Sequence, residues 1–147
     1  MKKTDLPISL EFNFENSVKQ VWSAITKLDE MVAWYFDNIP DFKPEVGFKT
    51  SFLVQSETRK FTHNWEITEV VNLKKLVYNW QYPEYEGDLD VVFELVETPE
   101  GTQLKLAVII KEDFPDEIPE FRRDSCIGGW NYFLDGRLRL YLEKQHN

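Results

Sequence analysis

Apolar and polar residues alternate along most of the chain, and this two-residue period predicts β-strands with one buried face and one exposed face. In residues 8–14, for example, Ile8, Leu10 and Phe12 alternate with polar side chains. The same alternation recurs over residues 48–54, 61–67, 76–82, 89–95 and 104–110. The predicted turns between the later segments lie at Asn72–Lys74, Gly87-Asp88 and Thr98–Gly101. The pattern therefore predicts an antiparallel sheet whose later strands are joined by turns.

Helical spacing replaces the alternation in two parts of the chain. After the first strand, Ser17 and Gln20 have the spacing of a capping box, and apolar residues then recur at helical intervals up to Thr26. Residues 28–34 have the pattern of a second short helix, which ends before Pro40. After an acidic loop, the apolar stripe of a long C-terminal helix consists of Ile127, Trp130, Phe133, Leu134, Leu138, Tyr141 and Leu142.

These elements fit a single α+β domain that spans residues 1–147. A chain of this length is close to the usual size of one domain and can bury a substantial core. Two short helices follow the first strand and the longest helix comes last. We therefore expect a curved antiparallel sheet wrapped around the long C-terminal helix.

Aromatic side chains make up 15% of the residues, and the strand pattern places many of them on one face of the sheet. If the strands at 61–67 and 76–82 form an antiparallel hairpin with a short turn, Trp65 lies roughly opposite Trp80, and His63 roughly opposite Tyr82. The rings expected to converge under the last helix are Phe48, Phe52, Trp65, Tyr78, Trp80, Phe93 and Trp130. Such a cluster either fills a solid core or lines a ligand pocket, and the sequence leaves both interpretations open.

The charge balance argues against two classes of partner. Asp and Glu total 26 against 17 Lys and Arg, and the resulting net charge of -9 repels nucleic-acid backbones and anionic lipid heads. No segment approaches the ~20 apolar residues that span a bilayer, and the N-terminal residues lack the apolar centre of a signal peptide. A single cysteine, Cys126, is typical of a reducing compartment. We expect a cytoplasmic monomer or homodimer that binds neither nucleic acid nor membrane.

Few residues are candidates for catalysis. The two histidines, His63 and His146, and the one cysteine lack the spacings of a metal site, so neither a metal ion nor another cofactor is predicted. The chain has no Gly-x-Ser-x-Gly motif and no glycine-rich phosphate loop. His63 shares a strand face with Trp65 and is a candidate general base, although a lone histidine on a strand is more often a structural, hydrogen-bonded residue. The pattern favours a binding protein over an enzyme.

Short motifs along nearly the whole chain carry a family resemblance. They are Val21-Trp22, Ala24-Ile25-Thr26 and Trp34, then Trp65-Glu66-Ile67 and Leu76-Val77-Tyr78-Asn79-Trp80, then Glu100-Gly101-Thr102 with Leu104 and Leu106, and finally Gly129-Trp130 with Leu134, Leu138, Tyr141 and Leu142. Together they resemble the activator of heat-shock protein 90 ATPase homologue branch of the START-like, birch-pollen-allergen-like superfamily, which is also called SRPBCC. The resemblance implies a helix-grip fold, often with a hydrophobic cavity between the sheet and the C-terminal helix.

The resemblance also implies a range of functions, because members of the superfamily bind lipids, hormones or polyketides. Our leading hypothesis is a protein that binds a hydrophobic or aromatic small molecule. The ligand-binding residues predicted on this basis are Trp34, Phe48, Phe52, Trp65, Tyr78, Trp80, Tyr82, Phe93, Trp130 and Leu134. One alternative is a co-chaperone-like activator of heat-shock protein 90 ATPase, or an interaction module that uses the acidic loops. Another is a cavity enzyme of the cyclase or hydrolase type, with His63 or a tyrosine as acid or base.

Overall fold

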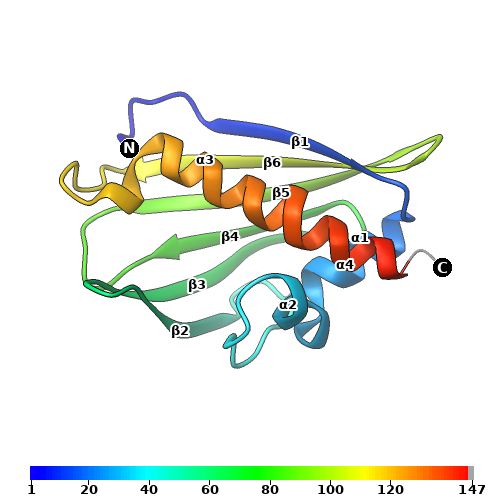
Figure 1. Ribbon diagram of the computed structural model, residues 1–147, viewed down its shortest axis with the longest axis horizontal. Helices are drawn as coiled ribbons and strands as arrows, with labels where there is room; N and C mark the ends of the chain where they lie inside the picture. The colour runs from blue at the N-terminus through cyan, green and yellow to red at the C-terminus, as the bar shows by residue number, and fades with distance from the viewer. Residues whose placement is uncertain (146–147) are drawn as a thin grey trace.

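The computed structural model describes residues 1–145, so His146 lies outside the described residues. Figure 1 shows one curved antiparallel sheet in the order β1-β6-β5-β4-β3-β2. Its strands are β1 (Ile8–Phe14), β2 (Lys49–Gln55), β3 (Lys60–Val71), β4 (Lys75–Gln81), β5 (Asp88–Thr98) and β6 (Gly101–Glu112). Alternate residues of each strand are buried, which confirms that one face of the sheet carries the core.

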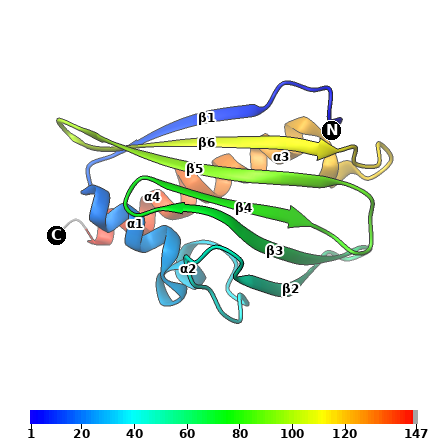
Figure 2. The same ribbon diagram turned by 180° about the vertical axis from the view of Figure 1, so that it is seen from behind.

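All the helices lie on the same side of the sheet. They are α1 (Val18–Thr26), α2 (Leu28–Trp34), a short 3-10 turn η1 (Pro119–Phe121), and a continuous C-terminal helix made of α3 (Arg123–Asn131), η2 (Tyr132–Leu138) and α4 (Arg139–Gln145). In Figure 1 the C-terminal helix crosses the concave face of the sheet, and α1 and α2 lie near α4, the last part of this helix. Figure 2 shows the opposite face, which no helix covers. The predicted helix-grip α+β fold is therefore confirmed.

The start of α1 follows the predicted capping box. The Ser17 hydroxyl accepts a hydrogen bond from the backbone N–H of Gln20, and the Gln20 side chain accepts one from the backbone N–H of Ser17, both at 3.2 Å. The Trp34 indole N–H donates to the carbonyl oxygen of Ala24 at 2.8 Å and ties α2 to α1. Together α1 and α2 connect the two edge strands, β1 and β2.

The central hairpin has the predicted register. Trp65 pairs with Trp80, and their ring centroids are 5.2 Å apart. The ladder between β3 and β4 ends at Asn64 and Gln81, but the rings of His63 and Tyr82 lie beyond it at 5.0 Å from each other. The sequence pattern therefore places His63 beside Tyr82 correctly, although Tyr82 follows the strand.

A π-helical segment, η2, interrupts the C-terminal helix, and the sequence analysis did not predict it. The buried residues of this helix lie four apart at Trp130, Leu134, Leu138 and Leu142. In an α-helix with 3.6 residues per turn, each step of four residues drifts about 40° around the axis. The wider π turn offsets this drift. It thereby keeps all four side chains against the sheet.

Within residues 1–145, no helix is both long and apolar enough to cross a bilayer.

Candidate functional site

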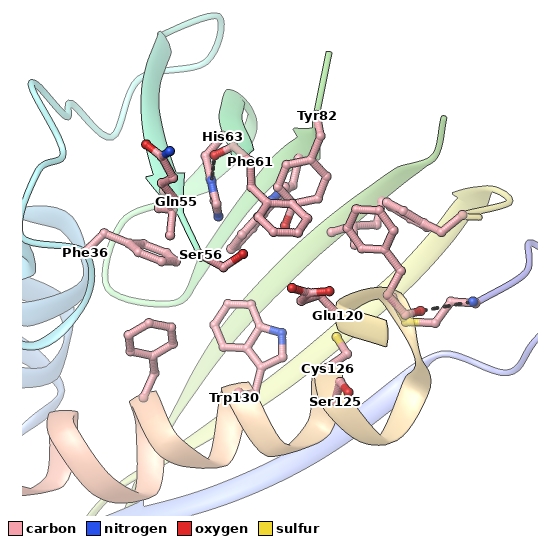
Figure 3. A pocket seen from close by; sticks show the side chains of 18 residues that line it. Phe36, Gln55, Ser56, Phe61, His63, Tyr82, Glu120, Ser125, Cys126 and Trp130 are labelled. Carbon is pink, nitrogen blue, oxygen red and sulfur yellow. Dashed lines mark hydrogen bonds between the residues drawn. The ribbon is translucent and has the colours of Figure 1, made fainter. Parts of the chain in front are cut away.

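A pocket of about 380 Å³ lies between the sheet and the first half of the C-terminal helix. Its sheet side is formed by the end of β2, the start of β3, the end of β4 and the start of β5, and its helix side by η1, α3 and the first turn of η2. Figure 3 shows His63 and Tyr82 on the sheet side facing Cys126 and Trp130 on the helix side. The wall is mostly aromatic, with rings from Phe36, Phe61, His63, Trp80, Tyr82, Phe114, Phe121, Trp130 and Phe133.

The pocket opens between the β2–β3 turn and the start of α3. The exposed residues at this mouth are Gln55, Ser56, Glu120, Ser125 and Gly129. Arg59 in the turn forms an ion pair with Glu120 at 3.3 Å and so joins the two sides of the mouth. The interior is therefore apolar, and the charged groups lie at its edge.

Gly129 leaves free space at this mouth. A Cβ atom built on Gly129 would have no other atom within 4 Å, and the same holds for its neighbour Gly128. Glycine in a helix interior costs about 1 kcal/mol relative to alanine, and packing requires neither glycine here. Gly129 lines the pocket whereas Gly128 does not, so only a side chain at position 129 would narrow the entrance.

His63 is a buried polar residue in the pocket wall, and a hydrogen bond fixes the orientation of its ring. Its side chain is held on the sheet side, and the residue is only 4% exposed. Nδ1 lies 2.9 Å from the carbonyl oxygen of Phe61, as the dashed line in Figure 3 marks. A carbonyl oxygen can only accept a hydrogen bond, so Nδ1 carries the proton and donates. In the neutral ring Nε2 is then a hydrogen-bond acceptor, and it has no partner among residues 1–145.

Burial keeps three titratable side chains of the pocket wall, those of His63, Tyr82 and Cys126, uncharged at neutral pH. It lowers the pKa of His63 to about 4, against smaller opposing effects of the Phe61 hydrogen bond and the Glu84 carboxylate. Burial likewise raises the pKa of the Tyr82 hydroxyl, and the neighbouring Trp80 offsets part of that rise. It raises the pKa of the Cys126 thiol to about 11, which leaves the thiol protonated and a poor nucleophile. At neutral pH His63 is therefore uncharged, and it is a weak base.

The structure brings together only some of the residues predicted to bind ligand. Trp80, Tyr82 and Trp130 line the pocket, and so does His63, the candidate general base. The other predicted residues lie outside the pocket wall; they are Trp34, Phe48, Phe52, Trp65, Tyr78, Phe93 and Leu134. All of these except the half-buried Phe48 are part of the buried core. The structure thus contains both a packed aromatic core and a pocket beside it.

Several wall residues were not among the predicted site residues. Phe114 and Phe121 are 2% and 4% exposed, although they lie within or beside the acidic segment that the sequence analysis treated as a loop. Phe36 follows α2, and Phe133 belongs to the apolar stripe of the last helix. The presence of phenylalanines in a charged segment was a usable signal, because solvated loops rarely need such rings.

A pair of buried tyrosines packs next to the pocket. The hydroxyl groups of Tyr35 and Tyr78 are 2.8 Å apart and hydrogen-bonded to each other. The Tyr35 ring packs against Trp130 and Phe133, which are both wall residues, at 6.0 and 5.0 Å between centroids. Burial is the main reason that the pKa of each hydroxyl is raised. The pair is a polar contact inside the core and keeps both hydroxyls satisfied.

Among the described residues, no group of three or more His, Cys, Asp or Glu side chains is placed to hold a metal ion.

Comparisons with solved structures place the fold among bacterial proteins. The MLL2253 protein of Mesorhizobium loti is 25% identical, with a TM-score of 0.73 over 95% of this chain and 98% of that one. Mll3558 of Rhizobium loti has a TM-score of 0.79 at 15% identity, over 92% and 96% of the two chains. DynU16, a protein of the dynemicin biosynthetic locus, has a TM-score of 0.75 at 20% identity, over 95% of this chain and 48% of that one.

No curated protein matches the chain closely enough to count as a relative. The family model described as "Activator of Hsp90 ATPase homolog 1-like protein" matches residues 15–143, which includes the two short helices, five of the six strands and most of the C-terminal helix. The match agrees with the resemblance in the sequence motifs, and the chain belongs to this family.

Proposed function

We propose that this protein binds a small, largely apolar ligand in the pocket between the sheet and α3, and that it does so in the cytoplasm. The observation that carries the proposal is the aromatic wall around a volume of about 380 Å³, which falls within the usual range of about 300–1,000 Å³ for small-molecule sites. Burial of apolar ligand surface against these rings is the driving force. The mechanism is binding, without a bond-breaking step.

The open space at Gly129 gives the proposal its sharpest test. Gly129→Leu places a side chain at the mouth of the pocket, and Gly128→Leu makes the same change one residue away, outside the wall. Both variants gain the same helix propensity, so they differ mainly in the entrance. With N-phenyl-1-naphthylamine as an uncharged fluorescent probe, we expect Gly129→Leu to weaken binding at least tenfold and Gly128→Leu to leave it unchanged.

Titration of the probe fluorescence measures both dissociation constants, and thermal unfolding of each variant checks that the fold is intact. Equal binding by the two variants would place the probe elsewhere on the protein. It would contradict the proposal that this pocket is the binding site. Failure of the unaltered protein to bind the probe would count against it as well.

A second candidate function is activation of the ATPase of heat-shock protein 90. It is favoured by the name of the family whose model matches residues 15–143. The acidic segments 84–90 and 112–120 are candidate contact surfaces for a basic partner. ATPase rates of the heat-shock protein 90 from the same organism, with and without this protein, test the idea. An unchanged rate at saturating protein would eliminate it.

Catalysis is less well supported by the geometry of the pocket. A general base works best when its pKa lies near the working pH, whereas the pKa of His63 is about 4. The thiol of Cys126 is protonated at neutral pH for the reason given above. The wall groups are therefore better suited to bind than to transfer protons.

A further inference from the structure

We propose that the ligand of this pocket is an uncharged ring compound with an O–H or N–H group that donates a hydrogen bond to Nε2 of His63. This inference rests on the proposed function and adds the chemical class of the ligand. It follows from the direction of the His63 acceptor in the wall, from the rings that fix it, and from the placement of charge around the pocket.

His63 offers a ligand a hydrogen-bond acceptor. Its Nδ1–H is used by the carbonyl oxygen of Phe61, so the ring cannot turn over without losing that hydrogen bond. Nε2 is left with a lone pair and no partner in the described part of the chain. Figure 3 shows the ring projecting from the sheet side into the pocket, opposite Trp130. A ligand that donates to Nε2 replaces the water that can otherwise reach this acceptor from the pocket.

Neighbouring aromatic rings hold the His63 acceptor in a fixed position. The His63 ring stacks on Phe52 with 5.0 Å between centroids and 19° between planes. Phe36, Trp80 and Tyr82 surround it at 4.9, 5.1 and 5.0 Å. These contacts leave the ring little freedom to tilt, and a preorganised acceptor discriminates well between ligands with and without a donor.

The described wall of the pocket carries few charged groups. No lysine or arginine among residues 1–145 lines the pocket, and the amino group of Met1 already donates to the Phe121 carbonyl oxygen at 3.2 Å. Glu120 is the one acidic side chain in the described wall; it lies at the mouth and is paired with Arg59. A carboxylate beside His63 would lose its hydration without a lysine or arginine counter-ion, because the one cationic group in the described wall is the Met1 ammonium, which is directed at the Phe121 carbonyl oxygen. An ammonium group of a ligand would likewise lose its hydration there. The wall therefore selects uncharged ligands.

Three probes with the same two-ring skeleton test the inference near neutral pH. 2-Naphthol is neutral and has a donor, 2-methoxynaphthalene is neutral without a donor, and 2-naphthoate carries a negative charge. Calorimetric or fluorescence titration of the unaltered protein gives the three dissociation constants. We expect 2-naphthol to bind about tenfold more tightly than 2-methoxynaphthalene, as one buried hydrogen bond allows. We expect 2-naphthoate to bind most weakly.

Two variants connect the preference to His63. His63→Phe keeps a ring among Phe36, Phe52 and Trp80 but removes the acceptor, so the two neutral probes should bind equally and the binding of 2-methoxynaphthalene should persist. That persistence shows that the variant retains the fold and the pocket. His63→Gln has a side-chain oxygen that can accept, and it should restore part of the preference for 2-naphthol.

The outcomes separate this inference from the proposed function. Equal binding of the two neutral probes to the unaltered protein would leave the pocket as an apolar site and overturn the donor requirement. An undiminished preference for 2-naphthol in His63→Phe would overturn the role of His63. Tightest binding of 2-naphthoate would identify an anionic ligand class, held near Arg59 at the mouth, and would also overturn it. Failure of all three probes to bind would contradict the proposed function together with this inference.

Discussion

Gly101→Ala is expected to destabilise the protein by more than about 3 kcal/mol. Gly101 opens β6 directly after the turn from β5, with a φ of 153°. A Cβ atom there would lie 2.2 Å from the carbonyl oxygen of Phe14 and 2.7 Å from the carbonyl carbon of Glu15. Both neighbours are backbone atoms at the end of β1, so neither can move away as a flexible side chain would. Urea-induced unfolding measures the effect.

Gly47→Ala is the matched control for this variant. Gly47 also has a positive φ, of 90°, but an added Cβ would have no other atom within 4 Å. The substitution therefore adds conformational strain of about 1–2 kcal/mol without a collision. The difference between the two variants isolates the close approach of β1 to the β5–β6 turn. Equal losses of stability would show that the contact at Gly101 relaxes freely.

The difference in stability between the unaltered protein and His63→Phe is expected to change by about 3 kcal/mol between pH 6.5 and pH 4. The pKa of His63 is about 4 in the folded protein and 6.5 in the unfolded chain. Between these two pH values the His63 ring is protonated in the unfolded chain but neutral in the folded protein. The stability that neutral His63 contributes is therefore fully present above pH 6.5 and is lost as the pH falls toward 4. Below pH 4 the difference in stability between the two proteins no longer changes with pH.

The comparison with His63→Phe removes the influence of the many carboxyl groups, because both proteins carry the same ones and their titration cancels in the difference. Among them, Glu84 faces His63 and opposes part of the effect of burial. Chemical denaturation at a series of pH values measures both free energies of unfolding. Parallel curves for the two proteins would mean that His63 is as well solvated in the fold as in the unfolded chain.

Most of the fold could be predicted from local pattern because its elements follow simple periods. Alternation defines the face of each strand, and the turn at residues 72–74 brings Trp65 close to Trp80. Their exact pairing also depends on a register shift of one residue between Ile67 and Glu69, which the alternation does not reveal. The π turn in the last helix is harder to predict, since its signal is a run of buried residues at intervals of four rather than a motif. The four-residue spacing of the apolar residues in the last helix could have indicated the π turn.

The pocket was only partly predictable for a different reason. The alternation along a strand determines which face of the sheet a side chain occupies. It does not determine whether the C-terminal helix contacts that side chain. Trp65, Tyr78 and Phe93 share the inner face with His63, yet they are buried in the packed core, whereas His63 lies where a space remains beneath α3. The position of Phe114 and Phe121 depends on the path of an irregular segment, which periodicity does not determine.

The strand order also governs how the chain reaches its native state. β1 pairs only with β6 among the described strands, so the sheet is complete only after Ile8 has paired with Val108, which is distant in sequence. Pairings between such distant residues carry a large loop-closure entropy, and proteins rich in them fold slowly, on a scale of about milliseconds to seconds. Until β1 has paired with β6, the aromatic residues of the core remain accessible to other chains. Newly made molecules should therefore be more prone to aggregation than the finished fold, in which β1 covers the edge of β6 and the aromatic core is buried.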